Sequence, residues 1–406
     1  MTIKRTIIII TSIACFFSCT FKSKLTTDNL VNGLYEVDLE NIPKDTDDTL
    51  FYSSVYKGIK TILLETNETC LIGGINKMHI HDDLIIILDR RYARSLYVFD
   101  KNGRFIRKIG SVGNGPGEYV EVTDFTIDKE NNTIYLFDTM MGRINKYDFA
   151  TGRFINVINL NPSIESRRIA YIGGKIYTDV YYSKHADDNC LLRVIDESSG
   201  EEELFLNVME YHKGISNTNN TAQIQVFFLL ENGNIAFFQQ FMNQIVEISK
   251  NGISTLVNFK GNNISTNLIK KAIENDPASY YDNIELLNTR IFLQLADIIE
   301  HEEYLHFSYC QYLSPVKFII NKQTKEVKVY PNHRDDLFLT ARYYGPLLHF
   351  GCYDSNGSYY YVPQMGMSHF VATVNDNGLP PDFDRLEELK NLTDEANPVI
   401  FYHEFK

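Results

Sequence analysis

Short apolar runs, each followed by polar or turn-forming residues, succeed one another from about residue 58 to the end of the chain. The runs at residues 84–88 and 133–137 read LIIIL and TIYLF, and each is followed by an aspartate and a polar loop. Runs of this length, bounded in this way, are typical of β-strands joined by hairpins. The 26 phenylalanines and 26 tyrosines also favour half-buried strands over helices.

The first two units of this pattern repeat each other. Residues 83–110 align with residues 132–160, and both units end in a tight turn followed by the letters RFI. Equivalent positions lie 48 or 49 residues apart, namely Asp89 and Asp138, Asp100 and Asp148, and Gly103 and Gly152. A period of this size with several short strands per unit is typical of a propeller blade, which needs its neighbours to bury its faces.

The repeat predicts the fold class and the strands of one blade. In the second unit we expect strands over residues 124–128, 133–138, 143–148 and 153–160. Weaker copies follow, so the predicted fold is all-β: a six-bladed β-propeller of four-stranded antiparallel blades, with short helical insertions. Five or seven blades remain alternatives, because the last two copies are inferred mainly from their position.

The two ends of the repeat region are expected to meet. The chain ends on an apolar run at residues 397–405, and residues 58–66 form a similar run before the first unit. A closed ring completes its last blade with strands from both ends, so these runs are predicted to be partners. Helices are expected over residues 265–276 and 382–392, the first because its apolar residues share one face.

The first 19 residues have the pattern of an export signal. Lys4 and Arg5 precede an apolar run that is too short to cross a bilayer, and Ser18 precedes Cys19. A cysteine after a small residue resembles the bacterial lipobox, in which Cys19 receives the lipid. We therefore expect a signal peptide at residues 1–18, a lipidated tether and lead-in at 19–50, and the propeller at 51–406. The alternative is an ordinary signal peptide that is cut nearby.

Charge and cysteine content limit the classes of partner. The net charge is -13 without a basic stripe, which argues against nucleic acid, a partner that requires clustered lysine and arginine. The remaining cysteines, Cys70, Cys190, Cys310 and Cys352, lie far apart without metal-binding spacing, so neither a bridge nor a metal is assigned to them. No cofactor is expected, and we expect a monomer.

Several of these stretches resemble one known group, the six-bladed β-propeller lipoproteins of Bacteroidota, whose blades are similar to NHL repeats. The residues that carry the likeness are "ILLETNETCLIGGINKM" at 62–78, the strands at 86–89, 124–128 and 134–138, the stretch "VFDKNGRFIRKIGSVGNGPGEY" at 98–119, and the closing "NPVIFYHEFK". The resemblance implies a propeller on the outer membrane whose molecular function is mostly unassigned. Acidic residues often follow the lipidated cysteine in surface-displayed members. Here "TFKSK" follows, which slightly favours the periplasmic side.

The glycine-rich loop at residues 108–122 does not fit a phosphate-binding loop. A P-loop needs lysine and a hydroxyl residue where this chain has Pro116 and Gly117. The loop is predicted instead to cross from one blade to the next, with Glu118 and Tyr119 near the mouth of the central channel. Loops on the same face carry Arg90, Arg91, Arg94 and Arg143. Solvated rim charges are the favoured interpretation, and a polar ligand site is the alternative.

No catalytic or metal-binding constellation is visible in the sequence. His79 and His81 share one face of a strand, but no third ligand follows at a suitable spacing, so no metal is assigned. The favoured hypothesis is a binding or scaffold module for an envelope protein, peptide or glycan. The alternative is an NHL-like lyase or glycan-acting enzyme that uses Arg91, Glu118 and Arg143. A weaker third hypothesis is a periplasmic sensor or an assembly partner of a transporter.

Overall fold

The computed structural model describes most of the chain beyond residue 32. The described residues are 33–39, 41, 49–180, 182–183, 190–207, 225–239, 242, 244–260, 295–311, 314–337, 350–353, 358–362, 366–376 and 378–406. The predicted signal peptide, Cys19 and the helix expected at residues 265–276 lie outside these residues.

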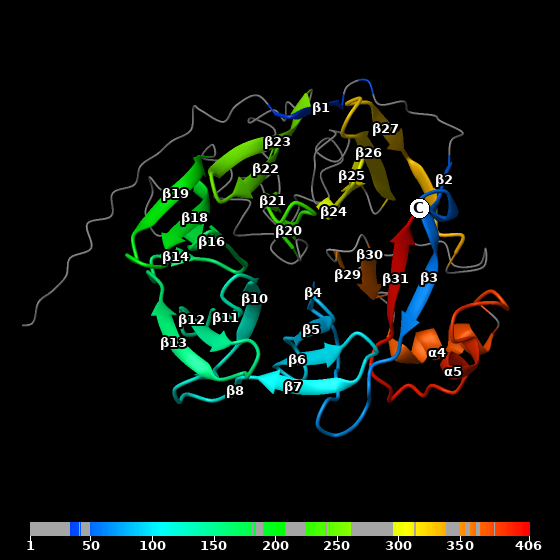
Figure 1. Cartoon of the computed structure of the whole chain (residues 1–406), viewed down its shortest axis with the longest axis horizontal. Helices are drawn as coiled ribbons and strands as arrows, with labels where there is room; N and C mark the ends of the chain where they lie inside the picture. Colours follow the sequence, from blue (N-terminus) through cyan, green and yellow to red (C-terminus); the bar gives the residue numbers. More distant parts are fainter. Residues whose placement is uncertain are drawn as a thin grey trace, which may run out of the picture.

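Small, mainly antiparallel sheets stand around a common centre in a β-propeller arrangement (Figure 1). Five of them have four strands. The first two are β4 to β7 and β10 to β13, with the bounds Lys77–His81, Leu84–Asp89, Ser95–Asp100, Phe105–Ile109, Val122–Asp128, Thr133–Asp138, Arg143–Asp148 and Phe154–Asn159.

The other three four-stranded sheets use strands from the rest of the chain. They have the orders β15-β16-β18-β19, β24-β25-β26-β27 and β29-β30-β31-β3. Their bounds are Ile169–Ile172, Lys175–Asp179, Cys190–Asp196 and Glu202–Asn207; Leu295–His301, Tyr304–Gln311, Ser314–Asn321 and Val327–Tyr330; and Phe350–Tyr353, Ser358–Val362, Ile400–Phe405 and Tyr56–Ile62.

The strands expected in the second unit are confirmed. The second and third strands begin and end where the pattern places them, the first begins two residues earlier, at Val122, and the fourth is one residue shorter at each end. The agreement follows from turn chemistry. Asp148 Oδ1 accepts hydrogen bonds from the backbone N and the hydroxyl of Thr151, and Gly152 then adopts a φ of 70°.

Among the described residues five sheets form four-stranded antiparallel blades, not the six that the sequence predicted. Strands β20 to β23, at Phe227–Leu229, Ile235–Phe237, Gln244–Ser249 and Gly252–Lys260, are joined by β1, at Tyr35–Asp38, which pairs in parallel with β23. Tyr35 and Val37 are buried while Glu36 is exposed, so β1 buries one face and covers an edge that would otherwise be unpaired. The lead-in before residue 50 therefore contributes a strand, which the sequence pattern did not indicate.

The predicted meeting of the two ends is present. Strand β31 pairs antiparallel with β3, from Tyr56 opposite Phe405 to Ile62 opposite Ile400. Helices α4, at Met367–Asn375, and α5, at Leu386–Lys390, pack outside this sheet (Figure 1). The helix expected over residues 382–392 is thus only five residues long, because Arg385 adopts a left-handed φ of 57° directly before it.

Short elements connect the sheets. They are β2, at Thr49–Phe51, which pairs with β28, at Asn332–Arg334; the 3-10 helix η1, at Tyr52–Ser54; β8, at Ser111–Val112, which pairs with β9, at Glu118–Tyr119; and β14, at Ile164–Glu165, which pairs with β17, at Tyr182–Ser183.

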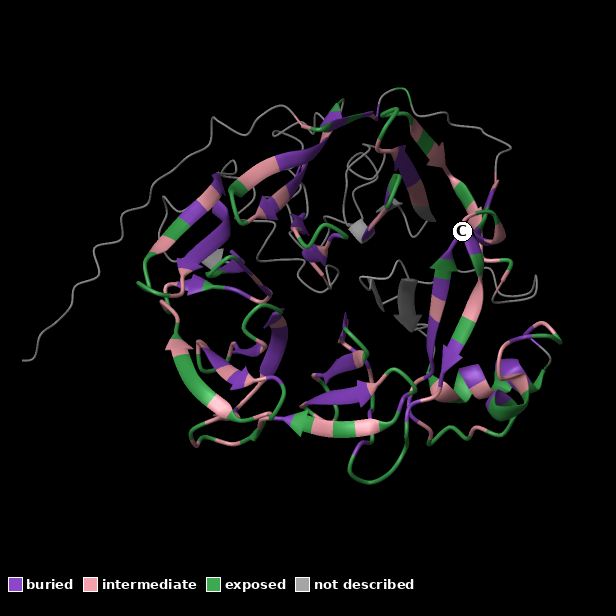
Figure 2. Ribbon diagram, in the orientation of Figure 1, coloured by how far each residue is buried: buried purple, intermediate pink, exposed green. Residues whose placement is uncertain are grey.

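The hydrophobic core lies between neighbouring sheets. Side chains of the first and second sheets, such as Leu88 and Phe125, form one buried cluster, and another cluster joins the second sheet to the third. The outer strand β13 has exposed or half-exposed residues along its length, whereas β5 and β11 are almost entirely buried (Figure 2). Each sheet therefore stabilises the next, as expected of propeller blades.

Candidate functional site

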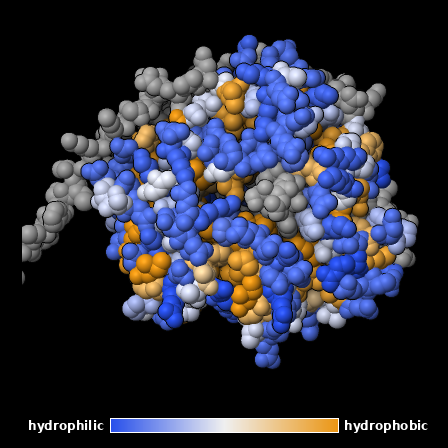
Figure 3. All heavy atoms as spheres, viewed as in Figure 1, coloured by the Kyte–Doolittle hydropathy of each residue, from blue (hydrophilic) through white to orange (hydrophobic). Residues whose placement is uncertain are grey.

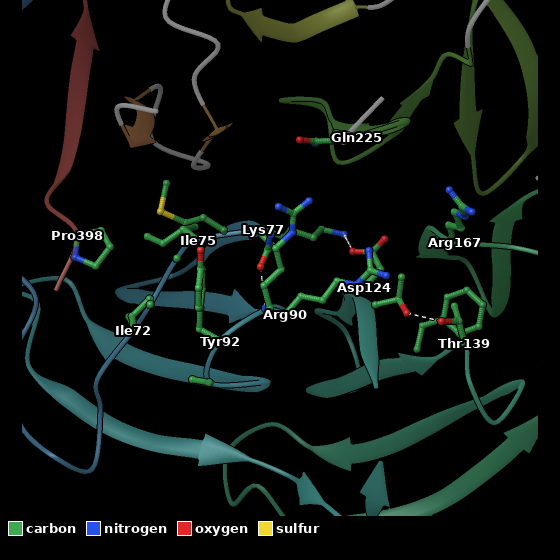
Figure 4. A pocket seen from close by; sticks show the side chains of 18 of the residues that line it. Ile72, Ile75, Lys77, Arg90, Tyr92, Asp124, Thr139, Arg167, Gln225 and Pro398 are labelled. Atoms are coloured by element: carbon green, nitrogen blue, oxygen red, sulfur yellow. Dashed lines mark hydrogen bonds and ion pairs between the residues drawn. The ribbon is translucent and has the colours of Figure 1, made fainter. Parts of the chain in front are cut away.

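A cavity of about 2190 Å³ lies at the centre of the ring, among loops of several sheets. Its lining comes from five stretches that are distant in sequence: 66–78, 90–93, 123–142, 160–168 and 391–398, with Gln225 to Phe227 and Gly366 to Met367 completing it. Pro398 and Arg167 lie on opposite sides, with Lys77 and Arg90 between them (Figure 4).

Buried aspartates hold the loops around this cavity. Asp89 Oδ2 accepts a hydrogen bond of 2.7 Å from Gly73 N, and its Oδ1 accepts one of 2.9 Å from Tyr92 N. Asp138, its equivalent in the second unit, accepts hydrogen bonds from Val120 N and Met141 N at 2.8 and 3.2 Å. Each carboxylate therefore ties the loop that enters its sheet to the loop that follows the second strand.

Asp179, at the end of the second strand of the third sheet, holds the loop that enters that sheet. Its Oδ1 accepts hydrogen bonds of 2.7 Å from both Arg167 N and Arg168 N. Burial raises the pKa of Asp179, against the lowering effect of these amides and of the Arg168 charge. The sequence signal for this residue is the aspartate that ends "KIYTD", in a copy of the repeat that is weaker than the first two.

A half-buried ion pair crosses from the first sheet to the second. Lys77 Nζ lies 2.6 Å from Asp124 Oδ1 and donates a second hydrogen bond of 2.7 Å to Phe125 O. The other oxygen of Asp124 accepts a hydrogen bond of 2.8 Å from Ile169 N, in the third sheet. Asp124 therefore joins three consecutive sheets at the cavity wall, a role that its place in a single strand did not reveal.

Two of the predicted site residues line the cavity. Arg90 donates hydrogen bonds of 2.9 and 2.7 Å to Glu121 Oε1 through its Nε and Nη2, so part of its charge is balanced. Arg91, next to it, is exposed. Their place in the loop after the second strand of the first unit is the one the sequence indicated.

The other three predicted residues lie elsewhere, and the reason is packing. Tyr119 is fully buried in the core between the first two sheets, which raises its pKa to about 12. Arg143 donates a hydrogen bond of 2.9 Å to Glu118 O and lies 3.8 Å from Asp138. Because none of Glu118, Tyr119 and Arg143 lines the cavity, the structure does not group Arg91, Glu118 and Arg143 as the enzyme hypothesis required.

In the glycine-rich loop, the carboxylate of Glu118 accepts a hydrogen bond from a backbone N–H that would bind a phosphate in a phosphate-binding loop. Glu118 Oε2 accepts a hydrogen bond of 2.7 Å from Gly115 N, and a Cβ at Gly113 would lie 2.1 Å from that oxygen. Strands β8 and β9 pair in parallel across the loop. The loop is therefore a closed crossover between the first and second sheets.

The two histidines of the first strand are packed against aromatic rings. His79 lies edge-on to Phe125 and His81 edge-on to Phe149, with ring centroids 6.4 and 5.3 Å apart. Burial lowers the pKa of both imidazoles, that of His79 well below its usual value. Among the described residues, no group of three His, Cys, Asp or Glu side chains is placed to hold a metal ion.

The described cysteines are buried, and the described helices are short. Cys70 Sγ donates a hydrogen bond of 3.1 Å to Glu65 O, and Cys190 is 5% exposed. The side chains of Cys310 and Cys352 lie outside the described set. In the part of the chain that the structure describes, no helix is long and apolar enough to cross a membrane.

Antiparallel sheets around a lined central cavity define this chain as a β-propeller protein. The chain belongs to the family described as "Domain of unknown function (DUF4934)", whose model matches residues 34–404. No curated protein matches it.

One solved structure supports the fold. A Bacteroides fragilis protein described as a "Putative exported protein" matches with a TM-score of 0.70 and 18% identity, over 92% of this chain and 99% of that one. A member of the DUF4221 family from Bacteroides vulgatus matches with a TM-score of 0.48 and 10% identity, over 87% and 97% of the two chains.

Proposed function

We propose that this chain is an exported binding module, anchored to the outer membrane through a lipid on Cys19, which takes a protein, peptide or glycan ligand into its central cavity. In this proposal residues 1–18 are a signal peptide, the tether begins at Cys19, and residues 51–406 build the propeller together with strand β1 of the lead-in. The five-stranded sheet of β20 to β23 with β1 serves as the sixth blade.

The observation that carries the binding function is the cavity. Its volume of about 2190 Å³ exceeds the roughly 300 to 1,000 Å³ typical of small-molecule pockets, so it suits a large ligand. The buried carboxylates of Asp89, Asp138 and Asp179 hold the backbone of its loops by hydrogen bonds. Other side chains of those loops are therefore available for contact with a ligand. A preorganised wall of this kind reduces the entropy cost of binding.

The export part of the proposal rests on the first 19 residues and on the likeness to an exported protein. Cells that express the chain with Cys19 or with Cys19→Ala are labelled with radioactive palmitate and fractionated. Label and membrane association are expected only with Cys19. Equal labelling of the two chains would overturn the lipid anchor, and protease shaving of intact cells tests the periplasmic side, where the chain is expected to be protected.

The binding part is tested with the full-length protein in detergent. Immobilised synthetic peptides and envelope oligosaccharides are offered to the wild type, to Tyr92→Ala at the cavity, and to Tyr304→Ala as a control that does not line it. Binding lost in Tyr92→Ala and kept in Tyr304→Ala is the expected result. If no probe binds, or if both variants behave alike, the cavity is not the binding site.

A further inference from the structure

Large apolar side chains are exposed on the loops that surround the cavity. Leu71, Tyr92, Met140 and Met141 are 51%, 72%, 67% and 47% exposed, and all four line the cavity. Exposed apolar groups gathered at one site mark interaction surfaces, and thioethers adapt readily to the shape of a partner. Figure 3 shows that one face of the molecule is mainly hydrophilic, with several hydrophobic patches.

Two of these side chains stand at equivalent positions of the repeat. Tyr92 N donates to Asp89 Oδ1 and Met141 N donates to Asp138 Oδ1, so each lies three residues after the buried aspartate of its sheet. The backbone at both places is thus fixed by the same contact. The apolar side chains therefore project from a fixed backbone, and a preorganised surface of this kind lowers the entropy cost of binding.

The acidic and basic residues of the cavity lining come mainly from different stretches of the chain. The lining residues of 66–68 and 391–398 include Glu68, Asp394 and Glu395, and no lysine or arginine. The lining residues of 90–93 include Arg90 and Arg91 and no acid, and those of 160–168 include two arginines and one glutamate. Figure 4 shows Pro398, of the acidic stretch, and Arg167 on opposite sides of the cavity.

Two basic side chains at the cavity are paired internally, Lys77 with Asp124 and Arg90 with Glu121. Arg91, Glu68, Asp394 and Glu395 also line the cavity, and all four are exposed. A ligand that matches the cavity therefore carries a negative group, a positive group and an apolar group.

We propose that the cavity binds an extended peptide segment, with an acidic side chain toward Arg91, a large apolar side chain against Tyr92 and Met141, and a basic group toward Asp394 and Glu395. A polypeptide carries all three chemical groups on one chain, whereas a neutral oligosaccharide carries none of the charges. The inference rests on the proposed binding function and names the ligand class of that same site.

The test uses isothermal titration calorimetry of the full-length protein with four octapeptides whose ends are blocked. One has lysine at one end, aspartate at the other, and phenylalanine and leucine between; two have lysine at both ends or aspartate at both ends; the fourth has serine at both ends. A neutral hexasaccharide is the fifth probe. The mixed peptide is expected to bind at least about tenfold more tightly than the neutral peptide, which is about 1.4 kcal/mol.

Variants then assign each end of the peptide. Arg91→Glu is expected to weaken the mixed and doubly acidic peptides about fivefold or more and to leave the doubly basic one unchanged or tighter. A double change, Asp394→Lys with Glu395→Lys, is expected to weaken the mixed and doubly basic peptides instead. Arg104→Glu, an exposed arginine outside the cavity lining, is the control and is expected to change nothing.

The outcomes separate this inference from the proposed function. If the hexasaccharide binds with sensitivity to Tyr92→Ala and the peptides do not, the site is a binding site but the peptide class is wrong. If all peptides bind equally well, the charge polarity plays no part and the inference fails. If no probe binds, the proposed binding function fails with it.

Discussion

Asn397 and Ile72 lie 325 residues apart in the sequence and are joined by a hydrogen bond of 2.7 Å, from Ile72 N to Asn397 Oδ1. Asn397 Nδ2 also donates to Glu65 O and to Cys70 O, at 2.7 and 2.8 Å. The amide therefore fastens the loop before the first sheet to the segment that leads into β31. Since β31 pairs with β3, this contact lies at the closure of the ring.

Removal of this amide is expected to destabilise the whole propeller. In Asn397→Ala, Ile72 N and two carbonyl oxygens lose their partner inside a site where Asn397 is only 2% exposed. Unmet backbone groups each cost about 1 kcal/mol or more, so a loss of about 2 to 4 kcal/mol in the free energy of unfolding is expected. Urea denaturation followed by circular dichroism measures it. Asn391→Ala, at an exposed position, is the control, and an equal effect in both would contradict the assignment.

Acid is expected to weaken the same closure through His403. Burial lowers the pKa of this imidazole to about 3, below its ordinary value near 6.5. The folded state therefore holds the neutral ring, which stacks on Tyr56 at 4.4 Å and lies 3.9 Å from Asp335. Because the unfolded chain binds a proton more readily, the contribution of His403 is complete above pH 6.5 and declines as the pH falls toward 3.

The pH dependence of His403→Phe tests this account. The phenyl ring keeps the stacking but does not titrate, so thermal unfolding midpoints measured between pH 7 and 4 are expected to fall less steeply than in the wild type. His369→Gln, at an exposed position on α4, should follow the wild-type curve. A curve for His403→Phe that is as steep as the wild-type curve would show that other groups cause the acid effect.

Substitutions at two glycines allow the cost of a left-handed backbone to be measured separately from the cost of steric crowding. Gly110 and Gly142 have φ values of 67° and 59°, but a Cβ at Gly110 would lie 2.7 Å from both Tyr119 and Tyr147, whereas one at Gly142 would meet nothing within 4 Å. Gly142→Ala is expected to cost about 1 to 2 kcal/mol from the left-handed conformation alone. Gly110→Ala should cost clearly more, as measured by denaturant midpoints. Equal losses would mean that the two tyrosines move aside without penalty.

The sequence predicted local structure well because short-range chemistry determines it. Four side chains each accept a backbone hydrogen bond within their own hairpin turn: Asp100, Asp148, Asp196 and Asn321. The turns and the strands beside them therefore repeat visibly in the sequence. Strand β1 could not be predicted in the same way. Its pairing with β23 depends on an open edge more than 200 residues away, which no local pattern reports.

The candidate site was predicted only in part for a similar reason. The loop that carries Arg90 and Arg91 follows a clear repeat, so its place at the cavity could be inferred. Glu118 and Tyr119 stand in a distinctive stretch, but whether Tyr119 faces the channel or the core depends on how the second sheet packs against the first. The opposite charges of Arg91 and Asp394 lie at one cavity only because the ring brings distant loops together.

Substitution of two aspartates tests whether a fixed backbone in the cavity loops contributes to ligand binding. Asp89 and Asp100 both accept backbone hydrogen bonds within a turn, but Asp89 holds the loop of Tyr92 while Asp100 holds an outer turn through Asn102 N and Arg104 N. Asp89→Asn replaces one acceptor oxygen with a donor, so Gly73 or Tyr92 loses its partner.

We expect both Asp89→Asn and Asp100→Asn to lower the free energy of unfolding, by about 1 to 2 kcal/mol. Asp89→Asn alone is expected to weaken binding of the octapeptide with lysine and aspartate ends, by about fivefold or more, because Tyr92 is no longer held in place. Calorimetry at a temperature where both variants are fully folded makes the comparison. If the two variants bind the peptide equally well, the fixed backbone of the loop contributes nothing to recognition, and the exposed side chains must adapt to the ligand instead.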